Sequence, residues 1–162
     1  GLNPGPQMHP REVLRKIEGM VEELKKMAHQ PSSYAITTRA KAIQEDWKKL
    51  PMRKPKEANL PARSYQFFMD IIFEKAFLEK LAYSKYEDFD QKNPQEQNQI
   101  KASIVKDLLH RDQSELETMQ NNSDNFRVET PDFEMMMKKK LSSLKRKVDV
   151  KNYILKQLSP RY

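Results

Sequence analysis

The chain has 162 residues, of which 37% are hydrophobic and 33% are charged, and its formal net charge is +7. It contains no cysteine, which excludes disulfides, thiolate zinc sites and a cysteine nucleophile. It contains only 3 glycines, and this scarcity favours an all-α fold, because hairpins, Rossmann turns and phosphate loops usually need glycine. No run approaches the roughly 18 consecutive apolar residues of a membrane span, and we expect no signal segment at the start.

Charge alternates along the chain. Residues 31–60 hold seven basic and three acidic side chains, residues 95–130 hold four and seven, and residues 131–162 hold nine and three. The basic and acidic side chains either pair with one another within the fold or leave a basic face for an acidic partner.

Residues 11–51 predict a helical hairpin that follows a flexible tail over residues 1–10. Apolar side chains recur at three- and four-residue intervals in its first helix, at about residues 10–28. A serine at 32 or 33 can cap the second helix, and Pro51 ends it, because proline disfavours helix at the preceding residue. The apolar face of this second helix consists of Ile36, Ala40, Ile43, Trp47 and Leu50.

Residues 52–61 are rich in proline and charge, and we interpret them as a linker packed loosely on the surface. Residues 62–158 then predict a helical bundle. Its first helix, at about residues 62–83, is apolar around more than half of its circumference, as expected of a helix that others surround.

Two further helix starts follow. Asparagine, proline and glutamate at 93, 94 and 96 form a strong start signal, and Thr130-Pro131 repeats it after a polar loop predicted over residues 120–129. Phe133 and later apolar residues are expected to face inward, and Asp149 is a candidate cap for a last helix. The sequence thus predicts a bundle of five or six helices, either as one body or as two small lobes, with a tail over residues 159–162.

The sequence offers no catalytic or metal-binding motif. His9, His29 and His110 are isolated from one another and from any carboxylate in a known ligand spacing. Nucleophile elbows, Walker lysines and glycine-rich loops are missing too. We therefore expect a non-enzymatic protein with no catalytic residues, no metal and no cofactor.

One candidate partner site lies on the predicted second helix. The residues Arg39, Lys41, Lys48 and Lys49, which we call the basic rim, surround its apolar face. Trp47 is the only tryptophan of the chain and serves as a core or rim anchor, more as packing than as a contact.

A second candidate surface lies near the C-terminus. It consists of Lys138, Lys139, Lys140, Lys145, Arg146 and Lys147, which we call the lysine face. Its lysine density suits phosphate contacts, although a charge run is usually a solvated helix face. Sequence-specific reading of single strands needs exposed aromatic residues among the bases, and few accompany this run. Three consecutive methionines at 135–137 cannot all face a core, so at least one of them is expected to be exposed or covered by another chain, although filling of the core is the commoner role of methionine.

The stretch Arg39-Ala40-Lys41-Ala42-Ile43, followed by Trp47-Lys48-Lys49-Leu50, resembles the last helix of the TFIIS N-terminal domain. Elongin A and Mediator share that helical domain. Residues 14–27 look like the helix before it, while the domain's earlier helices have no counterpart in this chain. The resemblance implies a docking module associated with transcription.

A fainter resemblance is collinear with the first. Residues 140–145, with Ile154-Leu155 and Ser159-Pro160, look like the end of the TFIIS central domain. The zinc ribbon that supplies transcript cleavage in that family needs cysteines, so the resemblance implies docking without polymerase-stimulating activity.

The leading hypothesis is a nuclear, or alternatively cytoplasmic, protein-interaction module that docks an acidic or amphipathic partner segment at the basic rim and Trp47. One alternative is a basic helical protein that associates with nucleic acid through the lysine face. A second alternative is a structural helical subunit of a larger complex. The three methionines and the very apolar helix predicted at about residues 62–83 are consistent with such a role. No membrane partner is expected.

Overall fold

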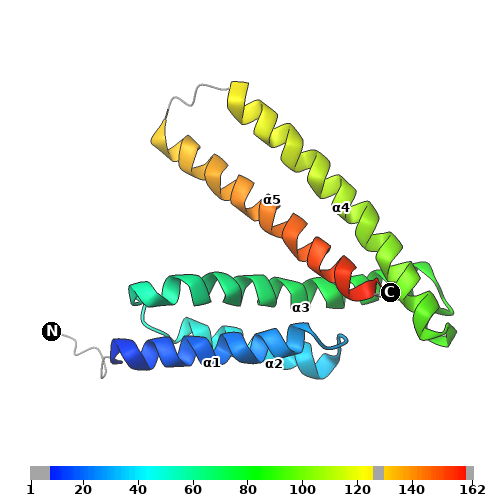
Figure 1. Ribbon diagram of the computed structural model, residues 1–162, viewed down its shortest axis with the longest axis horizontal. Coiled ribbons are helices and arrows are strands. Elements are labelled where there is room, and N and C mark those ends of the chain that lie inside the picture. The colour runs from blue at the N-terminus through cyan, green and yellow to red at the C-terminus, as the bar shows by residue number, and fades with distance from the viewer. Residues whose placement is uncertain (1–7, 126–129, 160–162) are drawn as a thin grey trace. The chain divides into compact units, whose positions relative to one another are not determined.

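The computed structural model describes residues 8–125 and 130–159, and within these ranges the chain is helical with no strand. The predicted all-α fold is confirmed. The five α-helices are α1 (Pro10–Ala28), α2 (Tyr34–Lys48), α3 (Asn59–Lys85), α4 (Pro94–Asn125) and α5 (Pro131–Leu158) (Figure 1). Two short 3₁₀ turns, η1 (Lys56–Ala58) and η2 (Phe89–Gln91), precede α3 and α4.

Two predicted boundaries are wrong. Asp149 does not cap a sixth helix, because α5 continues through it to Leu158. The polar loop predicted from residue 120 begins later, because α4 continues to Asn125; residues 126–129 lie outside the described ranges. The predicted tails, residues 1–10 and 159–162, also lie largely outside them.

The chain divides into two compact units, the first ending at Ala76 and the second beginning at Phe77, within α3. This boundary differs in place from the linker predicted at residues 52–61. We describe each unit by itself.

Several helices have a side-chain N-cap at the residue where the sequence predicts one. The backbone N–H of Ile36 donates to Ser33 Oγ at 3.2 Å, and that of Glu96 donates to Asn93 Oδ1 at 2.8 Å. Thr130 Oγ1 accepts from the backbone N–H of Phe133 at 3.2 Å. Each cap satisfies a donor that the first turn leaves without a helical partner, and such a cap stabilises a helix by about 1 kcal/mol.

In the first unit, the segment between α2 and α3 is part of the core. Ala58, in η1, is buried together with Leu50 and with Val13 and Ile17 of α1. Half-buried apolar side chains, Trp47 among them, pack around this cluster. The interpretation of residues 52–61 as loosely packed therefore does not hold at Ala58.

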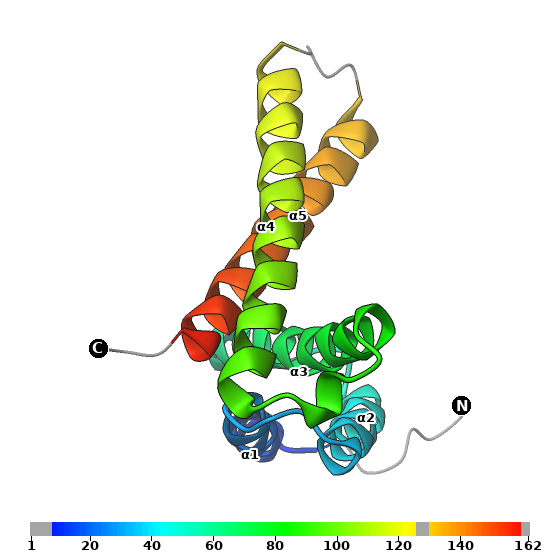
Figure 2. The same cartoon turned by 90° about the vertical axis from the view of Figure 1, so that its right-hand side faces the viewer.

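In the second unit, α4 and α5 lie side by side as an antiparallel pair (Figures 1 and 2). Val105 and Leu109 of α4 and Leu144 of α5 are buried. Lys151 of α5 is buried too, and its Nζ lies 2.6 Å from Asp112 Oδ2 of α4. The ion pair therefore links the two helices from within their packed part.

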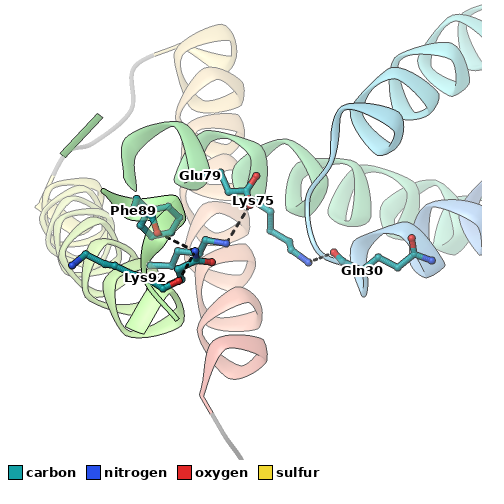
Figure 3. Close-up of polar contacts among 7 residues, drawn as sticks. Gln30, Lys75, Glu79, Phe89 and Lys92 are labelled. Atoms are coloured by element: carbon teal, nitrogen blue, oxygen red, sulfur yellow. Dashed lines mark hydrogen bonds and ion pairs between the residues drawn. The ribbon is translucent and has the colours of Figure 1, made fainter. Parts of the chain in front are cut away.

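The loop before α4 is held by one aromatic side chain. Phe89 of η2 is buried, and the ring of Tyr83 meets its ring edge-on with centroids 4.9 Å apart. Gln97 Nε2 donates to the carbonyl oxygens of Phe89 and Lys92, at 3.0 and 3.1 Å (Figure 3). These contacts fix the chain entering α4.

The Asp112–Lys151 pair yields a stability prediction. Asp112→Ala removes the carboxylate that lies against the buried Lys151 ammonium, and we expect the free energy of unfolding to fall by about 3–5 kcal/mol. Asp112→Leu combined with Lys151→Met removes both charges and should stay within about 1 kcal/mol of the parent protein. Urea denaturation followed by circular dichroism measures both. Asp107→Ala, on the exposed side of α4, is the control; equal stability of the Asp107 and Asp112 variants would contradict the prediction.

Candidate partner-binding surfaces

Arg39, Lys41 and Lys48 of the basic rim lie on α2 and Lys49 is its C-cap residue, and all four cations are exposed. Arg39 faces Glu23 of α1: its Nε lies 2.6 Å from Glu23 Oε2, and its Nη2 lies 3.0 Å from Oε1. This bidentate contact lowers the pKa of Glu23 below its ordinary value of 4.5, mainly through the hydrogen bonds that Arg39 donates. The same bonds raise the pKa of Arg39. Arg39 thus ties α2 to α1.

Two other cations of the basic rim have acidic neighbours on their own helix. Lys48 Nζ lies 3.0 Å from Glu45 Oε1, and Lys49 Nζ lies 3.9 Å from Asp46 Oδ1. Such exposed pairs contribute little free energy, so a partner's carboxylates can compete for these lysines. Within the described part of the chain, Lys41 alone of the four makes no ion pair. The basic rim is therefore largely charge-balanced.

Trp47 packs inside the first unit. Its ring stacks on that of Tyr65 in α3, with centroids 3.8 Å apart and planes 14° apart. Lys54 Nζ lies 5.4 Å from the Trp47 ring centroid and also donates to the Pro51 carbonyl at 3.2 Å. An aromatic stack together with a cation over the ring accounts for the placement of this side chain without a partner.

The side chain of Lys75 in α3 caps the C-terminal end of α1. Its Nζ donates to the carbonyl oxygen of Ala28 at 3.0 Å and to that of Gln30 at 2.6 Å; Figure 3 draws the bond to Gln30. The last carbonyls of a helix lack helical partners and carry partial negative charge, so a lysine there is favourable. Sequence analysis missed this contact and the Tyr65 stack, because their partners are distant along the chain and no local pattern marks them.

The lysine face lies on α5 and is far less balanced than the basic rim. Lys138 has an acidic neighbour, with its Nζ 3.7 Å from Glu134 Oε1. Arg146 is half-buried. The other four are exposed and make no ion pair with any residue of the described ranges: Lys139, Lys140, Lys145 and Lys147.

Large apolar side chains lie exposed next to these lysines. Phe133, Met135 and Met136 are 41%, 60% and 43% exposed, and Met137 is half-buried. Phe133 was expected to face inward, and this expectation is wrong. Phe133 lies in the first turn of α5, at the end of the helix pair, and is not part of its buried core.

The histidines lie apart. His9 Nδ1 accepts from the backbone N–H of Arg11 at 3.1 Å and caps α1. His29 Nδ1 lies 2.8 Å from the Lys25 carbonyl oxygen, and His110 is exposed on α4. Across residues 8–125 and 130–159, no three histidine or acidic side chains cluster in a way that could hold a metal ion. No helix in these ranges is long and apolar enough to cross a membrane.

No protein-family model matches this chain, and comparisons with curated proteins and with solved structures give no match either.

The buried Tyr65 predicts a loss of stability at alkaline pH. Burial raises the pKa of its hydroxyl above the ordinary 10.0, so the folded protein holds this proton more tightly than the unfolded chain. The stabilisation is complete below pH 10 and is lost as the pH rises past it. We expect urea titrations followed by Trp47 fluorescence to show a fall in stability above pH 10 that Tyr65→Phe reduces. An identical fall in the two proteins would argue against this role.

The Arg39–Glu23 contact predicts a structural role for Arg39 that Lys41 lacks. Arg39→Ala should lower the free energy of unfolding by about 0.5–1 kcal/mol, the upper range for an exposed ion pair. Lys41→Ala, the control on the same helix, should leave it unchanged within about 0.5 kcal/mol. Trp47 fluorescence in urea measures both variants. Equal effects would mean that the bidentate contact adds nothing to stability.

Proposed function

We propose that this protein is a non-enzymatic interaction module that binds an acidic segment of a partner protein through the lysine face of α5. One observation carries the proposal. Four exposed lysines of α5, at 139, 140, 145 and 147, make no ion pair within the described ranges, and exposed apolar side chains lie beside them. A surface that combines unbalanced positive charge with exposed phenylalanine and methionine suits a ligand that is both acidic and apolar.

The lysine face suits this role better than the basic rim. On the basic rim, Arg39 is engaged with Glu23, and both Lys48 and Lys49 have acidic neighbours. A partner's carboxylates would have to displace these contacts to bind there. On the lysine face four cations need no such exchange, so the electrostatic attraction for an acidic partner is greater.

A setting in the nucleus, in association with transcription, is part of the proposal. Its support is the resemblance of Arg39–Ile43 and Trp47–Leu50 to the TFIIS N-terminal domain. In this protein those residues lie on α2, where Trp47 packs on Tyr65. The resemblance therefore bears on the scaffold of the first unit, while the proposed binding surface belongs to α5.

Binding of nucleic acid through the same lysines is a second candidate. The absence of ion pairs at lysines 139, 140, 145 and 147, within the described ranges, favours phosphate contacts as well as carboxylate contacts. Phe133 is the only exposed aromatic residue of α5, and stacking platforms for single strands use several. Contacts to phosphates without base reading are therefore the form that this candidate takes.

Charge reversal on the two surfaces separates these possibilities. The test variant is Lys139→Glu/Lys140→Glu/Lys145→Glu, and the matched control is Lys41→Glu/Lys48→Glu/Lys49→Glu, with the same change in net charge. The probe is a labelled acidic peptide with regularly spaced leucines, and fluorescence anisotropy measures its binding. We expect the α5 variant to weaken binding at least about tenfold, or 1.4 kcal/mol, and the control by much less.

Random-sequence DNA and RNA serve as competing probes. If they bind with a steep dependence on salt that the α5 variant flattens, and the peptide does not bind, nucleic acid is the ligand. If only the α2 variant weakens peptide binding, the basic rim is the site and the proposal is wrong.

A further inference from the structure

Burial along the α4–α5 pair ends abruptly. The side chains of Ile104, Val105 and Leu109 in α4, and of Leu144, Val150 and Ile154 in α5, are buried. In contrast, no side chain of residues 110–122 or of residues 130–143 is buried. We call residues 113–122 of α4 and 131–143 of α5, which the antiparallel hairpin brings to the same end of the pair (Figures 1 and 2), the open end of the hairpin.

The open end nevertheless has an apolar seam. Its large apolar side chains are half-buried or exposed, and they come from both helices: Leu116, Met119, Phe133, Met136, Met137 and Leu141. Met137 and Leu141 continue the heptad spacing of the buried Leu144 and of Val148, so they belong to the same packing face. Two helices alone bury only one narrow strip between them. A third helix is what completes such a core elsewhere in helical bundles.

Charge at the open end indicates which helix fits. Its α5 segment holds Lys138, Lys139 and Lys140 against the acids Asp132 and Glu134, whereas its α4 segment holds the acids Glu115 and Glu117 and no base. Lys145 and Lys147 extend the positive charge by two turns. A second copy of this chain is a poor occupant, because each copy carries a net charge of +7. A helix that carries carboxylates on the flank that meets α5 matches the positive charge of α5.

We infer that the open end of the hairpin binds one acidic amphipathic helix of a partner protein, which packs on Met136 and its apolar neighbours as the third helix of a bundle. This inference rests on the proposed function and specifies the ligand's conformation and its apolar contacts. Methionines suit the role, because their unbranched side chains adapt to different apolar surfaces. The recognition is of the helix-on-apolar-face kind, in which side chains at i, i+3, i+4 and i+7 make the contacts.

The test uses the full chain and two acidic peptides of identical composition. One places its leucines at heptad spacing, and the other has them scrambled so that no apolar face forms. The variant Phe133→Ser/Met136→Ser removes exposed apolar side chains at the open end. The matched control is Met52→Ser/Leu60→Ser, which removes two exposed ones in the first unit, where Met52 is 99% exposed. Anisotropy measures affinity, and amide hydrogen exchange reports where protection appears.

We expect the amphipathic peptide to bind at least about tenfold more tightly than the scrambled one. The Phe133/Met136 variant should remove most of this preference, whereas the Met52/Leu60 control should keep it. Hydrogen exchange should slow in residues 113–122 and 131–143 when the peptide is bound.

Other outcomes overturn the inference in distinguishable ways. If the two peptides bind equally and only charge reversal of the lysines weakens them, the proposed function stands and the third helix is wrong. If neither peptide binds, the proposed function fails as well. If analytical ultracentrifugation shows a dimer of the parent chain that the Phe133/Met136 variant abolishes, a second copy occupies the open end.

Discussion

The ion pair between Asp112 and Lys151 sets the register of α4 against α5, and the surfaces of the second unit depend on that register. With the Lys151 ammonium 2.6 Å from the Asp112 carboxylate, the heptad positions of Leu144 and Lys151 face α4. Lys145 follows Leu144 by one residue, a turn of about 100° that places it on the flank of the pair, and Lys138 lies one heptad earlier on the same flank. A slip by one residue would separate the Lys151 ammonium from the Asp112 carboxylate, so the pair acts through specificity of packing more than through net stability.

The first unit uses charge differently. Lysine and arginine side chains there bind groups of the same unit: Arg39 binds Glu23, Lys75 binds the end of α1, and Lys54 lies over Trp47. These basic side chains therefore make contacts that hold α1, α2 and α3 together. Residues 31–60 are nevertheless rich enough in basic side chains to resemble a binding surface. The number of basic residues in a segment is thus a poor guide to its free positive charge.

Local signals predicted the helices well, because periodicity and capping act over a few residues. Ser33, Asn93 and Thr130 cap the helices at which the sequence places them. Asp149 is of a residue type that often caps helices. Its neighbours Val150 and Lys151 are buried, however, and their packing favours a continuous helix over the start of a new one. The Trp47–Tyr65 stack joins residues that no local pattern relates. For the same reason, the sequence shows that both candidate surfaces are rich in basic residues, but it does not show on which of them acidic neighbours balance the positive charge.

The two helices of the open end carry exposed charges of opposite sign, and this difference restricts the charge pattern of the proposed ligand. Glu115 and Glu117 of α4 are exposed and make no ion pair within the described ranges, while α5 presents unpaired lysines. A helix that is uniformly acidic would be attracted by α5 and repelled by α4. The best fit is a helix with carboxylates on the flank that meets α5 and neutral or basic residues on the flank that meets α4. Repulsion by α4 would then reject acidic segments of the wrong pattern or orientation, since selective binding needs unfavourable contacts with competitors as well as favourable contacts with the ligand.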